Sequence, residues 1–123
     1  MTTQVYLETY SDADFRLSQD SPLHPVRIGS NPLHMHVRTL ADDNTVWLDA
    51  TSVNGMLLVQ AGTGDTPDVV SIFIPQNRLL NLPVGDYVYS LIMSNVNLGL
   101  RTEVWRGALK HSAGPTRWTA GKP

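Results

Sequence analysis

The chain has 123 residues, the size of one ordinary domain, with 41% hydrophobic and 16% charged residues, a balance that excludes an intrinsically disordered protein. It contains no cysteine, which excludes disulfides and thiolate metal sites, and its net charge of −2 gives no general reason to expect nucleic-acid binding. Its apolar runs are too short to span a bilayer, and its first residues lack the pattern of a signal peptide. We therefore expect a protein that is made in the cytoplasm and needs no membrane.

The charges are distributed unevenly along the chain. Residues 1–68 hold nine acidic and three basic residues, whereas residues 101–123 hold five basic residues and one acidic residue. Such polarity can set the register between neighbouring subunits, although ordinary solvated charges give the same pattern.

The first part of the chain predicts two strands and an irregular stretch. Residues 4–10 alternate in polarity and predict a strand, and residues 15–17 predict a short second strand. Residues 20–32 contain three prolines, which remove backbone donors, and predict an extended loop or a ragged edge strand. We interpret residues 1–32 as an N-terminal arm of strand and loop.

The middle of the chain predicts further strands. Residues 33–40 alternate cleanly, and a turn joins them to a returning strand at residues 46–50, where Trp47 is expected in the core. Asn54 and Gly55 predict a two-residue type I′ hairpin turn, because that turn needs a positive φ at both positions.

The later part of the chain contains the strongest strand signal. A loop at residues 62–68 precedes a strand at 69–74 and a single helical turn within 76–82. The strand at residues 87–93 has two apolar-leaning faces, so we expect it to be central and buried on both sides. Residues 100–110 predict a long final strand.

No stretch has the length and period of a capped helix, and seven or eight short strands are separated by turn signals. This pattern predicts an all-β protein with one antiparallel sandwich domain over residues 1–123. We place the sandwich core at residues 33–110 and a C-terminal tail at 111–123, so that arms extend at both ends.

Two histidines are the best candidates for metal ligands. His34 and His36 fall on one strand face, about 7 Å apart along the strand. Copies related by a symmetry axis could complete a metal site, but a polar stripe facing solvent or an interface is the simpler explanation of the pair. His24 and His111 are isolated in sequence and are expected on the surface.

No motif in the chain identifies a catalytic chemistry. The glycine-rich stretch at 62–64 lacks the Lys–Ser/Thr pair of a phosphate loop, and neither a G-x-S-x-G nor an H-E-x-x-H pattern occurs. We therefore predict a protein that is not an enzyme and that needs no cofactor.

Tryptophan and arginine near the C-terminus are candidates for partner binding. Trp118 and Arg117 lie in an aperiodic tail, where a large aromatic side chain can anchor in a neighbour's pocket or fold back on its own domain. Trp105, in the last predicted strand, is a third candidate for partner binding or for the core.

The sequence L-P-V-G-D-Y-V-Y-S-L from Leu82, followed by R-T-E-V-W-R-G-A-L-K from Arg101, resembles small immunoglobulin-like virion proteins of tailed bacteriophages. It is similar to the N-terminal domains of upper-baseplate and tail-associated proteins. The resemblance implies an immunoglobulin-like sandwich in which Leu82, Gly85 and Tyr87 form a tyrosine corner and Gly107 lies in the last strand. All four roles are structural.

The resemblance implies a non-enzymatic structural component of a phage particle, in the tail, baseplate, neck or head decoration. Its expected partners are other virion proteins and copies of itself, with no membrane and no direct nucleic acid. The alternative is an immunoglobulin-like module that binds a glycan or a host surface through Trp105, Tyr6, Tyr10 or the face carrying His34 and His36.

Overall fold

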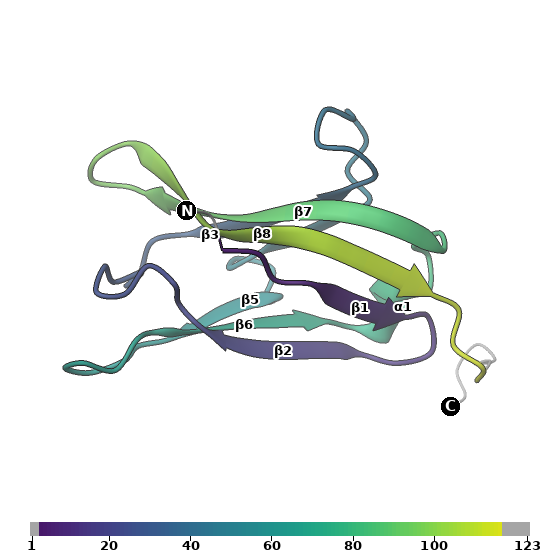
Figure 1. The fold of residues 1–123 in the computed structure, drawn as a ribbon, viewed down its shortest axis with the longest axis horizontal. Coiled ribbons are helices and arrows are strands. Elements are labelled where there is room, and N and C mark those ends of the chain that lie inside the picture. The colour runs from purple at the N-terminus through teal and green to yellow at the C-terminus, as the bar shows by residue number, and fades with distance from the viewer. Residues whose placement is uncertain (1–2, 117–123) are drawn as a thin grey trace.

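The computed structural model describes residues 3–116, whose strands form two facing sheets (Figure 1). Sheet A has the strand order β1, β8, β7, β3, β4, and sheet B has the order β2, β6, β5. The predicted all-β sandwich is confirmed. Its elements are β1 (Leu7–Tyr10), β2 (Phe15–Asp20), β3 (Leu33–Arg38), β4 (Leu48–Thr51), β5 (Leu57–Gln60), β6 (Val69–Ile74), the helix α1 (Gln76–Leu79), β7 (Gly85–Asn95) and β8 (Leu100–Ser112).

The core lies between the sheets and follows from the alternation of apolar residues along each strand. On β7 the side chains of Tyr87, Tyr89, Leu91 and Met93 are buried. The opposite face of β7 is only partly covered, and Val88 is exposed. The prediction that both faces of this strand are buried is wrong, because no described segment forms a third layer over sheet A.

The N-terminal segment is part of sheet A. β1 runs parallel to β8, with Leu7 opposite Leu109, so the sandwich is not purely antiparallel. The segment before β1 also joins this ladder, because the Val5 amide donates to the Arg106 carbonyl at 2.8 Å. β2 pairs with β6 in sheet B.

The proline-rich stretch after β2 is also anchored to the domain. Ile28 is fully buried, and its amide donates to the Asp68 carboxylate at 2.9 Å. The described part of residues 1–32 is therefore not an arm. At the other end, β8 continues to Ser112, so the segment predicted as a tail begins inside a strand.

The corner before β7 has the predicted hydrogen bond. The Tyr87 hydroxyl donates to the Pro83 carbonyl, and burial raises the pKa of this hydroxyl. Leu82 is buried below the turn, and Gly85 begins the strand. These residues hold the connection from α1 against the core.

Gly107 is required by a close approach of two backbones. A Cβ atom at this position would lie 2.0 Å from the Val5 carbonyl oxygen. The structural role predicted for Gly107 thus has a specific cause, the docking of the N-terminal segment on β8.

Two local predictions are wrong. Trp47 is 43% exposed. Leu48 and Ala50 of β4 point into the core, so Trp47, which directly precedes Leu48, points to the opposite face. Asn54 and Gly55 do not form a type I′ hairpin turn, because Gly55 alone of the two has a positive φ and the connection crosses from sheet A to sheet B. The Asn54 side chain instead accepts from the Thr51 and Met56 amides.

Candidate functional site: a groove on the outer face of sheet A

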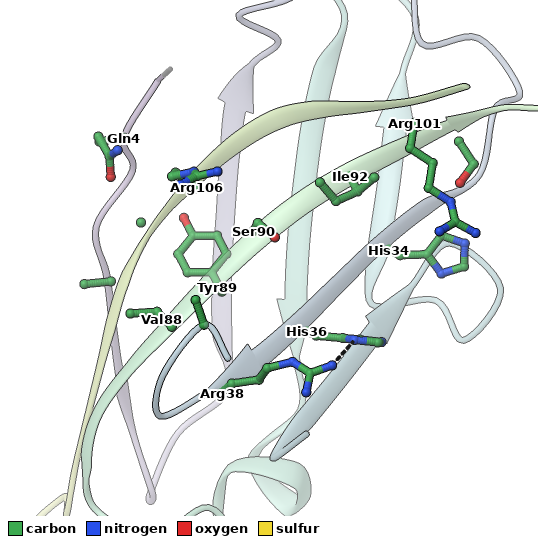
Figure 2. Close-up of a pocket in the computed structure, with 14 residues that line it drawn as sticks. Gln4, His34, His36, Arg38, Val88, Tyr89, Ser90, Ile92, Arg101 and Arg106 are labelled. Carbon is green, nitrogen blue, oxygen red and sulfur yellow. Dashed lines mark hydrogen bonds between the residues drawn. The ribbon is translucent and has the colours of Figure 1, made fainter. Parts of the chain in front are cut away.

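A groove of about 730 Å³ lies on the face of sheet A that points away from sheet B. Its floor is the outer face of β7 from Val88 to Ser94, which carries no charged side chain, and basic side chains from β3 and β8 stand on either side (Figure 2). Its lining residues are Gln4, His34, His36, Arg38, Ala41, Val88, Tyr89, Ser90, Ile92, Ser94, Arg101, Arg106, Gly107 and Ala108.

The alternation of β3 supplies one side of the groove. Leu33, Met35 and Val37 are buried, so the intervening His34 and His36 point outward, as predicted. Arg38 follows them on the same face and lines the groove.

A β-bulge supplies the other side. The register between β7 and β8 shifts so that Leu91 pairs with Trp105 and Ile92 pairs with Glu103. Two consecutive residues, Val104 and Trp105, are therefore both buried. Because a one-residue shift reverses the faces of a strand, Arg101 and Arg106 both reach the outer face despite their odd spacing.

His36 is held between a base and an acid. The Arg38 guanidinium lies 3.4 Å from its Nδ1, and its Nε2 lies 3.3 Å from Asp49 Oδ1. Since a guanidinium can only donate, Nδ1 accepts and the ring proton of a neutral imidazole lies on Nε2, facing Asp49.

Arg38 also fixes the β3–β4 connection. Its guanidinium donates to the Asp43 carbonyl at 2.5 Å. Hydrogen bonds from Thr39 and Thr45, with the nearby Arg38 charge, lower the pKa of the Asp43 carboxyl. The connection is thereby held beside the groove, which Ala41 lines.

The two arginines of β8 differ in their surroundings. Arg106 makes three hydrogen bonds to Glu103, between 2.7 and 3.0 Å, and this pairing raises its pKa. The side chain of Arg101 has neither a hydrogen bond nor an ion pair with any residue of the described part of the chain, and the same holds for the side chain of His34. Figure 2 draws Arg101 and His34 at the same end of the groove.

The metal candidates lack a complete ligand set within one chain. Across residues 3–116, no group of three or more histidine and acidic side chains is arranged to hold a metal ion. A site that combines His34 and His36 from several copies stays a prediction.

The candidates for partner binding separate into three groups. Trp105 is fully buried, so its assignment to partner binding is wrong. Tyr6 and Tyr10 are exposed, at 57% and 45%. Trp118 and Arg117 lie outside the residues that the structure describes.

Trp105 belongs to a hydrogen-bond chain that joins three segments. Its Nε1 donates to the Tyr89 hydroxyl at 3.0 Å, and this hydroxyl donates to the Val5 carbonyl at 2.6 Å. Burial raises the pKa of Tyr89 to about 12, so its hydroxyl remains a donor. These two hydrogen bonds connect β7 and β8 to the N-terminal segment below the groove.

A buried carboxylate organises one set of loops. Asp68, 3% exposed, accepts from the Ile28 amide, the Gly62 amide at 2.8 Å and Arg27 Nη1 at 3.0 Å. The two amides, with Arg27, lower the pKa of this carboxyl despite its burial. The loop signal at residues 62–68 gave no indication of this role.

His111 is buried as well, contrary to its predicted surface position. It is 1% exposed, and its Nδ1 lies 2.8 Å from Thr9 Oγ1. Its Nε2 has no hydrogen-bond partner among the described residues. Burial lowers the pKa of this ring, and the Leu79 backbone offsets only part of that effect.

The fold and the groove define a β-sandwich protein with a basic cleft on an open sheet face. No family model matches the chain, and no curated protein matches its sequence. Within residues 3–116, no helix combines the length and the apolar character needed to cross a bilayer.

Proposed function

We propose that this chain is a non-enzymatic structural component of a tailed bacteriophage particle. It would pack between other virion proteins and copies of itself, in the tail, baseplate, neck or head decoration. The phage assignment rests on the sequence resemblance of residues 82–110 to immunoglobulin-like virion proteins.

An immunoglobulin-like topology is part of this proposal. The pairing of β1, β8, β7, β3 and β4 opposite β2, β6 and β5 is compatible with the order A′GFCC′ opposite BED. The hydrogen bond from Tyr87 to Pro83 supports the same proposal, because it matches the tyrosine corner expected before strand F.

The observation that carries the packing role is the set of exposed apolar side chains on the two connections at opposite ends of β3 and β7. The β3–β4 connection exposes Leu40 (64%) and Trp47 (43%), and the β7–β8 hairpin exposes Val96 (69%), Leu98 (68%) and Leu100 (59%). Both connections extend from sheet A (Figure 1). Exposed apolar side chains gathered on two projections are typical of a surface that other proteins cover.

The test is the composition of particles. Mass spectrometry of purified virions from a phage that encodes this chain should find it at a fixed copy number. A chain shortened by residues 117–123 tests whether Trp118 and Arg117 contribute to incorporation. The proposal fails if the protein is made during infection but is missing from purified particles.

A second candidate, a module that binds a glycan or host surface, is favoured by Tyr6 and Tyr10, which are exposed near and on the edge strand β1. Binding of the isolated protein to a glycan array, lost in Tyr6→Ala and Tyr10→Ala, would support it. A metal shared through His34 and His36 would appear in elemental analysis of the purified protein.

A further inference from the structure

We propose that the groove along β7 is a docking site for an extended acidic peptide segment of a partner protein. The inference deepens the proposed function, because it names the chemistry of the partner that covers sheet A. It concerns the outer face of β3, β7 and β8.

The charges in the groove favour a carboxylate-rich occupant. Three arginines line the groove and no carboxylate does. Asp43, Asp49 and Glu103 lie around it, and Glu103 already pairs with Arg106.

The end of the groove at Arg101 and His34 is therefore the strongest anion site. Neither side chain has a partner among residues 3–116, so the Arg101 guanidinium can bind a carboxylate through two parallel hydrogen bonds. Arg38 provides a second positive charge farther along the groove, because its guanidinium donates to a backbone carbonyl and an imidazole, neither of which carries a negative charge.

The shape of the groove favours an extended segment that binds through its side chains and not through its backbone. β7 is paired on both sides, with β3 and β8, so its backbone cannot add another strand. The outward positions from Val88 to Ser94 cover about 20 Å, the length of about six extended residues. In such a segment alternate side chains face the groove at intervals of about 7 Å, the spacing of successive outward residues on β3.

The lining argues against a glycan or a single-stranded nucleic acid. Tyr89, the sole phenylalanine, tyrosine or tryptophan of the lining, is 4% exposed, and its hydroxyl is already hydrogen-bonded to the Val5 carbonyl. The exposed rings of the groove are thus the imidazoles of His34 and His36, and no phenol or indole face is open for a sugar or a base to stack on. The apolar side chains at both projections, such as Trp47 and Leu98, suit a protein partner whose flanking residues are apolar.

The experiment measures binding of a fluorescein-labelled hexaglutamate peptide by fluorescence polarisation. The full chain should bind it at low ionic strength and more weakly as salt is added. Arg101→Glu should weaken binding by about tenfold or more, since it replaces the unpaired cation with an anion. Arg78→Glu is the matched control, because Arg78 is exposed on α1 outside the groove, and it should bind as the wild type does.

Four results would overturn the inference. The first is no hexaglutamate binding at low salt, and the second is equal weakening by Arg101→Glu and Arg78→Glu. The third is tighter binding, dependent on Arg101, of an oligogalacturonate or oligo-dT probe, which would assign the groove to a glycan or a nucleic acid. The fourth is self-association lost in Arg101→Glu on sedimentation, which would make the occupant a second copy of the chain.

The inference and the proposed function fail in different experiments. If the protein is present in particles and Arg101→Glu is incorporated normally, the groove does not dock the partner but the structural role stands. If hexaglutamate binding depends on Arg101 but the protein is missing from particles, the groove is a docking site for acidic peptides and the proposed phage role is wrong.

Discussion

Asp68 shows how one charged side chain can stabilise several loops at once. Its Oδ1 accepts from the Gly62 amide and Arg27, and its Oδ2 accepts from the Ile28 amide. A carboxylate suits this site because every contacting group is a donor, and the donors compensate for the desolvation of the charge.

We predict that Asp68→Asn lowers the free energy of unfolding by about 2–4 kcal/mol. The amide keeps one acceptor oxygen but places an NH₂ group against a backbone donor. Urea denaturation measures the change, with Asp65→Asn as the control because Asp65 is exposed in the same loop. Equal midpoints for the two variants would show that Asp68 does not hold the loops.

His111 should make the free energy of unfolding depend on pH between neutral and mildly acidic values. Its folded-state pKa is lowered by burial, so below about pH 6.5 the unfolded chain binds more protons than the folded chain. Stability should therefore fall as pH decreases from about 7, with a limiting slope of about 1.4 kcal/mol per pH unit. Asp43 and Asp68 have lowered pKa values, so their stabilising effect is lost only at more acidic pH.

The measurement is urea denaturation at a series of pH values. His111→Leu should remove the pH dependence of unfolding between neutral and mildly acidic pH, even if it changes the stability at pH 7. His34→Ala should keep that dependence, because His34 is exposed. The explanation fails if the dependence persists in His111→Leu.

At the scale of elements, β8 is stabilised by the segment that precedes β1. Gly107 leaves space for the Val5 carbonyl, which then accepts from the Tyr89 hydroxyl. An alanine at position 107 must push this segment away, because its Cβ would meet backbone atoms rather than a flexible side chain.

We predict that Gly107→Ala costs about 2–3 kcal/mol of stability and loosens residues 3–10 first. Hydrogen exchange should show faster exchange at the Val5 amide, which donates to Arg106. Ala108→Ser, a small change at the next position, is the control. Unchanged exchange at Val5 in Gly107→Ala would contradict the close approach.

Sequence patterns predicted the elements well where the signal was local. Alternation placed His34 and His36 on an outward face, and the corner pattern led to the Tyr87 hydrogen bond. The same reasoning assigned Trp47 to the core, because alternation gives two faces but does not say which one meets the other sheet. It also assumed that the apolar outer positions of β7 must be buried. Their burial would require a third layer over sheet A, and residues 3–116 form no such layer.

The groove could be predicted only in part, since it depends on pairings between distant strands. Its β3 side follows from local alternation. Its β8 side follows from the bulge at Val104, which brings Arg101 and Arg106 to one face, and regular alternation along β8 predicts the opposite. A bulge is set by the partner strand and the core, so the sequence of β8 alone does not reveal it.

At the scale of the whole molecule, the described N-terminal residues close the sandwich rather than extend from it. β1 covers the outer edge of β8, Leu7 and Thr9 are 1% exposed, and β2 begins sheet B. Burying a leucine side chain contributes about 1.5–3 kcal/mol, and the parallel ladder and the Val5 hydrogen bond add to this.

We therefore predict that deletion of residues 1–10 removes most of the stability of a domain that has only about 5–15 kcal/mol in total. The shortened chain should lose its cooperative thermal transition by circular dichroism, since the Thr9 contact of His111 and the Val5 contact of Tyr89 are both lost. Deletion of residues 117–123 is the comparison from the other end of the chain. If the N-terminal deletion unfolds within a few degrees of the full chain, residues 1–10 are an arm after all, and the free edge of β8 becomes the place to look for a neighbouring strand.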